Sequence, residues 1–125
     1  MAVLDASALL VFLNGEVGAS EVLLALNNAI MSSINHSEVV ARLSDTGMPA
    51  TEIRESLDGL RIEIVPFDTE QSYAAGMLRE ATRASGLSLG DRACLTLGIQ
   101  LGLPVLTADR VWADLDLGVE VKLVR

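Results

Sequence analysis

Aromatic residues and cysteine are both scarce in this chain of 125 residues. Aromatic residues make up 3% of the chain although half of it is hydrophobic, so the core must be built from Val, Leu, Ile and Ala. The single cysteine, Cys94, has no partner within the chain, which excludes an internal disulfide and a zinc site of Cys and His ligands. We therefore expect a reducing compartment, and the cytoplasm by default.

Long apolar runs are also absent. No run approaches the roughly 18 residues that a membrane helix needs, and no basic segment precedes the first apolar residues as it would in a signal peptide. We therefore expect a protein without a membrane partner.

Basic residues are few. Nine Lys and Arg face 17 Asp and Glu, which gives a formal net charge of −8. This balance argues against a protein that holds nucleic acid by bulk electrostatics, and it favours a basic partner. Eight of the nine basic residues are Arg, whose planar guanidinium suits bidentate contacts with phosphate.

The order of the segments predicts the fold class. No repeat, linker or low-complexity stretch divides the chain, so we expect one domain over residues 1–125. Strands are predicted at 2–5, 29–33, 61–65, 104–106 and 119–124, and helices at 7–13, 16–28, 35–45, 51–57, 68–85, 88–101 and, as a short turn, 110–115. Strands that alternate with helices indicate an α/β fold, a parallel β-sheet sandwiched between helices.

Helical spacing also predicts which side chains face the core. In the helix at 16–28 these are Val22, Leu23 and Leu26, and in the helix at 68–85 they are Tyr73, Met77, Leu78 and Ala81.

Four acidic residues stand at the ends of predicted elements. Asp5 and Asp109 directly follow apolar strands, and Glu38 and Asp91 lie in the first turns of predicted helices. Because ligands bind outside the carboxyl ends of parallel strands, we expect these carboxylates to meet at one edge of the sheet. Such a cluster repels itself unless it is protonated or holds a cation, and all-oxygen sites suit Mg²⁺ or Mn²⁺. The sequence therefore predicts metal-assisted chemistry on a phosphate.

Two of these acids also have a structural interpretation. The segments 35–38 and 88–91 both match a capping box, in which Glu38 or Asp91 would reach back to the start of its helix. The two interpretations are compatible, because one carboxylate oxygen can cap while the other faces a metal. Near the other two acids, the hydroxyls of Ser7 and Thr107 are candidates to orient a carboxylate.

Other polar residues near the four acids leave alternatives open. Arg92 follows Asp91 and Arg110 follows Asp109, so each is a candidate either for charge neutralisation or for a phosphate contact. Asp114 and Asp116 come just after Asp109, and one of them is a candidate auxiliary acid. His36 is the only histidine and lacks a nearby nucleophile elbow, so we expect it at the surface or beside a helix cap.

Four segments, in order, resemble the motifs of PIN-domain proteins, in particular the VapC-type ribonuclease toxins of bacterial toxin–antitoxin pairs. They are residues 3–10 (VLDASALL), 33–39 (SINHSEV), 87–95 (LSLGDRACL) and 106–109 (LTAD). The resemblance runs from end to end of the chain and implies a single PIN domain.

The resemblance also implies a function. It implies cleavage of RNA by water with Mg²⁺ or Mn²⁺, with Asp5, Glu38, Asp91 and Asp109 as the catalytic, metal-binding acids and with Ser7, Asn35 and Thr107 as supporting groups. It implies a homodimer and a cognate antitoxin whose tail fills the active groove. The acidic charge balance then predicts that this antitoxin is basic and places an Arg among the four acids. Two alternatives stay open: a non-catalytic PIN-fold binding module in a regulatory complex, and a structure-selective DNA nuclease.

Overall fold

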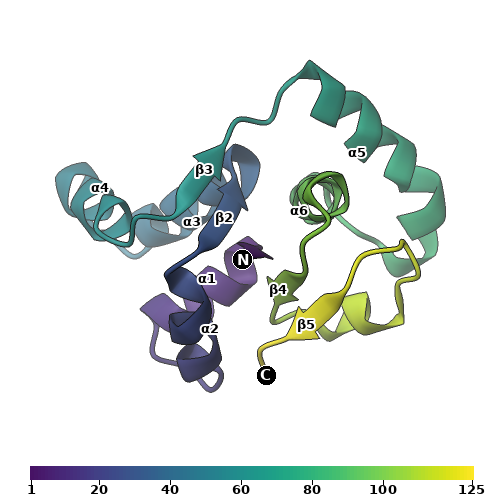
Figure 1. Cartoon of the computed structure of the whole chain (residues 1–125). Coiled ribbons are helices and arrows are strands. Elements are labelled where there is room, and N and C mark those ends of the chain that lie inside the picture. The colour runs from purple at the N-terminus through teal and green to yellow at the C-terminus, as the bar shows by residue number, and fades with distance from the viewer.

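The computed structural model describes all 125 residues as alternating strands and helices (Figure 1). The strands are β1 (Ala2–Leu4), β2 (Ala29–Ser32), β3 (Glu63–Val65), β4 (Val105–Thr107) and β5 (Val121–Leu123). The α-helices are α1 (Ala6–Leu13), α2 (Ala19–Leu26), α3 (Ser33–Asp45), α4 (Ala50–Asp58), α5 (Thr69–Thr82) and α6 (Leu89–Leu101), and two 3₁₀ segments are η1 (Arg83–Ser85) and η2 (Arg110–Asp114). Every predicted element is therefore present.

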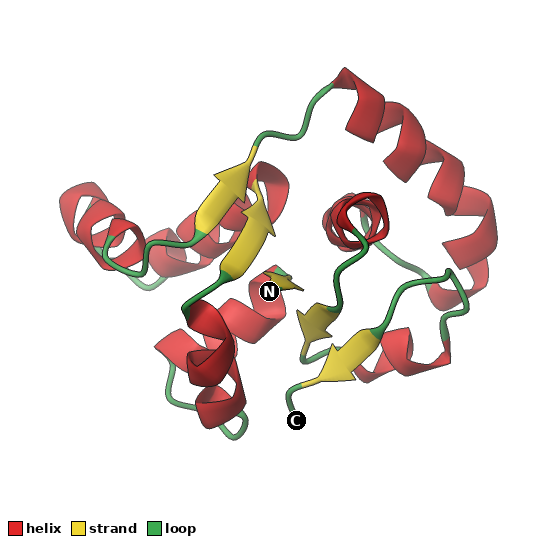
Figure 2. Ribbon diagram, viewed as in Figure 1, coloured by secondary structure: helices red, strands yellow, loops and turns green.

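The five strands form one parallel sheet in the order β3-β2-β1-β4-β5. The first strand of the chain is thus the central one, and Val3 pairs with Ile30 of β2 on one side and with Val105 of β4 on the other. The strands run between layers of helices (Figure 2), which confirms the predicted α/β fold. Because all strands are parallel, their carboxyl ends meet at one edge.

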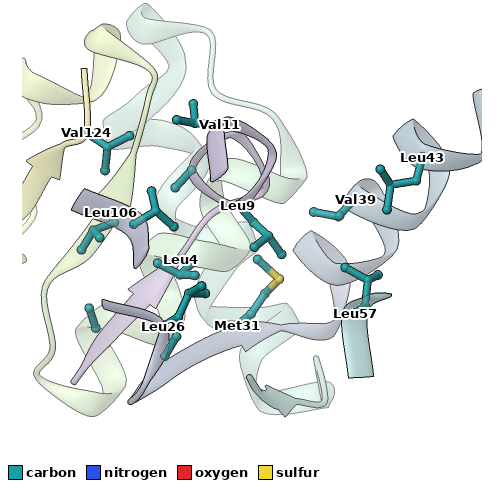
Figure 3. Close-up of a cluster of buried hydrophobic side chains, with 14 of the residues drawn as sticks. Leu4, Leu9, Val11, Leu26, Met31, Val39, Leu43, Leu57, Leu106 and Val124 are labelled. Carbon is teal, nitrogen blue, oxygen red and sulfur yellow. The ribbon is translucent and has the colours of Figure 1, made fainter. Parts of the chain in front are cut away.

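Alternating side chains of the sheet build two separate cores. Leu4, Met31 and Leu106 point to one face, where they pack against apolar residues of α1, α2, α3 and α4 (Figure 3). Val3 and Ile30 point to the other face and pack against α6 and the buried Trp112 of η2. Neither face of the central strands is exposed, in keeping with the apolar sequence of β1 and with that of β2 up to its last residue, the buried Ser32.

Helix α5 buries a different face from the predicted one. Tyr73 and Met77 are 70% and 78% exposed, and the buried residues are Gln71, Ala75 and Thr82. Small and polar side chains therefore lie against α6, and the guanidinium of Arg92 reaches across and donates to the carbonyl of Ala75 at 2.9 Å. Of the other residues predicted to face inward, Leu78 is half-buried and Ala81 is exposed.

Helix α2 shows a smaller departure of the same kind. Val22 and Leu26 are buried as predicted, but Leu23 is 57% exposed. The helix is only eight residues long and turns one narrow stripe to the core. Neither it nor any other helix has the length and the apolar character that crossing a bilayer would require.

Candidate active site

The four predicted acids line one pocket at the carboxyl edge of the sheet. Asp5, Glu38, Asp91 and Asp109 border this pocket, whose volume is about 210 Å³. Ser7, Asn35, Leu10 and Arg42 also border it. We call this hollow the acidic pocket.

The topology explains why residues so far apart in sequence meet there. Asp5 directly follows the central strand β1, and Asp109 lies two residues beyond the end of the neighbouring strand β4. Glu38 lies in α3, which starts where β2 ends. Helix α6 leads into β4 from the opposite direction, so its first turn, with Asp91, returns to the carboxyl edge.

Asp5 is the most constrained of the four carboxylates. It is 4% exposed, and Oδ1 accepts from the backbone N–H of Ala8 at 2.9 Å, which caps α1. The Ser7 hydroxyl donates to Oδ1 at 2.8 Å, and the Thr107 hydroxyl donates to Oδ2 at 2.8 Å. Both hydroxyls therefore lie where they can orient the Asp5 carboxylate, the role predicted for them.

The same two hydroxyls also join the end of β4 to Asp5. Ser7 Oγ accepts from the backbone N–H of Ala108 at 2.9 Å, and Thr107 Oγ1 accepts from that of Asp109 at 3.0 Å. Each hydroxyl thus receives one backbone bond and donates to the buried carboxylate. This arrangement fixes the spacing between Asp5 and Asp109.

Burial is the largest influence on the pKa of Asp5. Loss of solvation raises the pKa of Asp5 from 3.8 to about 6, against the opposing hydrogen bonds from Ala8, Ser7 and Thr107. The negative charge of Asp91 raises the pKa further. The field of the neighbouring acid is therefore felt at Asp5, as expected for carboxylates that share one pocket.

The position of the Glu38 carboxylate depends on close contact between α3 and α6. Asn35 is buried at 1% exposure, and its Nδ2 donates both to Glu38 Oε1 and to the carbonyl of Gly90, each at 3.0 Å. A Cβ atom on Gly90 would lie 2.4 Å from Glu38 Oε1 and 2.6 Å from Oε2. Gly90 is thus required for the carboxylate to rest against the start of α6.

The two predicted capping boxes have different outcomes. The one at α6 is present: Asp91 Oδ2 accepts from Ser88 N–H at 2.9 Å, and Ser88 Oγ accepts from Asp91 N–H at 3.2 Å. The one at 35–38 was wrong, because α3 begins two residues earlier, at Ser33, with Ser32 as its cap. Glu38 therefore lies within the helix and its side chain has no capping role.

The donor set fits a hard divalent cation. Asp91 uses one oxygen in the capping box, Asp109 one to cap η2 through Val111 N–H, and Glu38 one to accept from Asn35, so each leaves its other oxygen without a protein donor. Asn35 Oδ1 is also buried without a hydrogen-bond partner. Oxygen donors of this kind suit Mg²⁺ or Mn²⁺. No three His, Cys, Asp or Glu side chains converge closely enough to form a finished ligand set, so a cation would have to draw the carboxylates inward.

Several candidate residues lie outside the acidic pocket. Arg92 is buried and donates to Ala75 O, and Arg110 is exposed and does not border the pocket, so neither placement supports a phosphate contact at the acids. Asp114 and Asp116 are exposed and also lie outside the pocket, which removes the geometric reason for an auxiliary acid. His36 is half-buried and faces a different hollow, beside α4.

The single thiol lies in the core on α6. Cys94 is fully buried, and burial raises its pKa well above the usual value, with Asp5, Asp91 and Glu38 adding to this effect by their negative charges. A thiol that stays protonated is neither a nucleophile nor a metal ligand. This placement agrees with a site made of oxygen ligands.

Two site residues were not predicted, Gly90 and Arg42. A glycine in the first turn of a helix is costly, and that cost was the available signal for a close approach at Gly90. Arg42 follows Glu38 by one helical turn, a spacing that places both on the same side of α3. Neither position carries a residue type that marks a catalytic site by itself.

Comparison with known proteins places the chain in a family. The PIN domain family model matches residues 2–117. The fold is similar to a toxin–antitoxin complex from Klebsiella pneumoniae, with a TM-score of 0.77 and 19% identity over 100% of this chain and 98% of that one. It is also similar to DNA-bound VapBC from Salmonella typhimurium, with a TM-score of 0.75 and 18% identity over 99% of this chain and 98% of that one. FitAcB from Neisseria gonorrhoeae is similar too, with a TM-score of 0.72 and 20% identity over 99% of this chain and 98% of that one. No curated protein sequence matches the chain. With the family model covering nearly the whole length, the chain belongs to the PIN domain family.

Proposed function

We propose that this PIN-domain protein is a Mg²⁺- or Mn²⁺-dependent endoribonuclease that acts as the toxin of a toxin–antitoxin pair. The observation that carries the proposal is the convergence of Asp5, Glu38, Asp91 and Asp109, from four separate segments, in one pocket at the carboxyl edge of the sheet. A structural role does not require four carboxylates in one place, because their mutual repulsion is unfavourable.

The residues have distinct roles in this proposal. The free oxygens of Glu38, Asp91 and Asp109, together with Asp5, would hold the cation. When bound, Mg²⁺ or Mn²⁺ supplies Lewis-acid activation of water and of the phosphoryl oxygens. Ser7 and Thr107 keep the Asp5 carboxylate in one orientation, since both donate to it and are themselves fixed by backbone N–H groups of the β4 end.

Asn35 and Gly90 act on Glu38. The Asn35 amide holds Oε1, and the missing side chain of Gly90 leaves the space in which the carboxylate lies. Glu38 is otherwise an exposed, flexible side chain, so these two contacts are what keep it in the pocket. Pre-positioning of this kind lowers the entropy lost when a cation and a substrate bind.

The toxin role has support of a different kind. Similar folds occur in structures described as toxin–antitoxin complexes and VapBC. The net charge of −8 and a pocket of four carboxylates suit a basic antitoxin that inserts an Arg among the acids, held by charge-assisted hydrogen bonds. We also propose a homodimer, for which the exposed Tyr73 and Met77 on α5 offer an apolar face.

The decisive experiment compares two exposed glutamates. Purified protein, free of any antitoxin, is incubated with total RNA in EDTA and then with added Mn²⁺, and the products are mapped by end sequencing. We expect cleavage only with the metal, its loss in Glu38→Gln, and its retention in Glu70→Gln, a matched change on the exposed first turn of α5. Calorimetric titration with Mn²⁺ should show weaker binding to Glu38→Gln alone.

The alternatives predict other outcomes. A binding module would leave RNA intact with every metal, and Asp5→Asn would keep any toxicity seen on expression. A structure-selective DNA nuclease would cleave branched DNA and spare RNA in the same buffer. Undiminished RNA cleavage in EDTA would refute the metal-dependent mechanism.

A further inference from the structure

Arg42 is the one cationic residue that borders the acidic pocket. It lies on α3, one turn after Glu38, and its side chain is exposed. It makes no ion pair: the two ion pairs of the chain join Lys122 to Glu120 and Arg125 to Glu16. A guanidinium at the border of four carboxylates, yet bonded to none of them, is available for an external anion.

A second hollow begins where the acidic pocket ends. It has a volume of about 230 Å³ and lies between the ends of α1 and α3, bordered by Leu10, Asn14, Arg42, Leu43, Asp45 and Thr46. Leu10 and Arg42 border both hollows, so they form the divide between them. We call this second hollow the adjoining hollow.

The sizes of the two hollows indicate how a substrate would lie. Each is smaller than the roughly 300 Å³ at which ligand sites begin, so a polymer must extend over both. The adjoining hollow has the half-buried Leu10 and the buried Leu43 as apolar surface and polar groups around them. Apolar surface with polar edges suits a base and its sugar, while a cation held by the acids would suit a phosphate.

We infer that Arg42 binds the phosphate next to the one that is cleaved. The nucleoside that joins these two phosphates, and the strand that continues from it, lie over Leu10 in the adjoining hollow. The inference rests on the proposed nuclease function and gives the substrate strand a path, from the acidic pocket along α3 toward its C-terminal end. The guanidinium fork matches two phosphate oxygens, a geometry that a lysine cannot reproduce. In a chain with net charge −8, a single well-placed cation carries much of the affinity for RNA.

Binding, measured apart from cleavage, tests the inference. Asp5→Asn protein, which cannot cleave, is titrated with a fluorescent single-stranded RNA of mixed sequence at fixed MgCl₂ and varied KCl. Adding Arg42→Gln should weaken binding about tenfold at low salt, and the slope of log affinity against log salt should fall by roughly 0.7, the value for one phosphate contact on a single strand. Arg42→Lys should restore the slope but only part of the affinity.

Arg79 provides the matched control. It is an exposed Arg in the last turn of α5, as Arg42 is in the last turn of α3, and it borders neither hollow. Arg79→Gln therefore removes the same charge and the same favourable interaction with a helix end, and it should leave both affinity and slope unchanged.

Three other outcomes are possible, and each would overturn the inference about Arg42. Equal affinity and slope with and without Arg42→Gln would overturn the inference and leave the nuclease proposal intact. Failure of the Asp5→Asn protein to bind any RNA at low salt would also overturn the inference; because Asp5 is itself proposed to hold the cation, the nuclease proposal would still be decided by the cleavage assay with the wild-type protein. Unchanged RNA binding together with weaker capture of the partner protein by Arg42→Gln would assign the adjoining hollow to that partner, and would equally overturn the inference.

Discussion

Asp5→Asn should stabilise the metal-free protein at neutral pH, although it removes a central residue of the site. Burial raises the pKa of Asp5 to about 6, while the unfolded chain keeps a value near 3.8. A carboxyl whose folded pKa is raised favours the folded state fully below the unfolded value, and that contribution disappears as pH rises through the folded value. The wild-type protein should therefore lose stability between about pH 4 and pH 6.

The size of the effect follows from the same two values. Each tenfold change in acidity corresponds to about 1.4 kcal/mol, so the ionised Asp5 lowers the free energy of unfolding by about 3 kcal/mol above pH 6. Asparagine carries no charge and avoids this cost. The side-chain carbonyl of asparagine can still accept from Ala8 N–H. Its amide group, however, would face the Thr107 hydroxyl that donates to Asp5 in the wild type, and the loss of that hydrogen bond would cost about 1 kcal/mol at every pH.

The assay is a pair of thermal melts in EDTA, at pH 4 and at pH 7.5, for both proteins. The difference in free energy of unfolding between the variant and the wild type should move in favour of the variant by about 2.5 kcal/mol from the lower to the higher pH, or roughly 10 °C in Tm, since part of the effect is already present at pH 4. Saturating Mn²⁺ should reverse the order at pH 7.5, because the wild type binds it better. A difference that is the same at both pH values would refute the reasoning.

Three further predictions concern other parts of the molecule. Gly90→Ala should reduce cleavage roughly tenfold or more by displacing the flexible Glu38 carboxylate, with little change in Tm. Gly98→Ala, in contrast, should lower the free energy of unfolding by about 1–3 kcal/mol, because its Cβ would lie 2.5 Å from Val105 Cγ1 in the core. Cys94 should not react with a disulfide reagent at pH 8 until the protein unfolds, and fast reaction of the native protein would contradict its placement. Sedimentation velocity should show a dimer that Met77→Glu dissociates, and a wild-type monomer would count against the homodimer.

Local sequence predicted the elements and the four acids because each signal lies within a few residues. An apolar run followed by Asp marks both Asp5 and Asp109, and parallel topology is enough to bring them together. The hydroxyls of Ser7 and Thr107 lie two residues from these acids, so their role could also be inferred from spacing. The structure adds that both of them bond to Asp5.

Contacts between distant segments could not be predicted in this way. The Asn35 bond to Gly90 spans 55 residues, and the need for glycine there exists only because α3 and α6 approach closely. Helix α5 is the other example. Its larger apolar residues, Tyr73 and Met77, suggested the wrong buried face, because the residues of α5 that are buried are the small or polar Gln71, Ala75 and Thr82, and Arg92 of α6 donates to the Ala75 carbonyl.

The buried position of Asp5 bears on both the proposed metal and the proposed antitoxin Arg. A proton, a divalent cation and a guanidinium each relieve the same repulsion among the carboxylates, so they compete for one site. Since the pKa of Asp5 is about 6, the proton should begin to win below that pH, and both metal binding and capture of an antitoxin Arg should weaken there together. At neutral pH the proposed cation and the proposed antitoxin guanidinium would then compete with each other alone. Excess Mn²⁺ should then displace a weakened antitoxin variant, and displacement that does not depend on Mn²⁺ concentration would show that the Arg binds elsewhere.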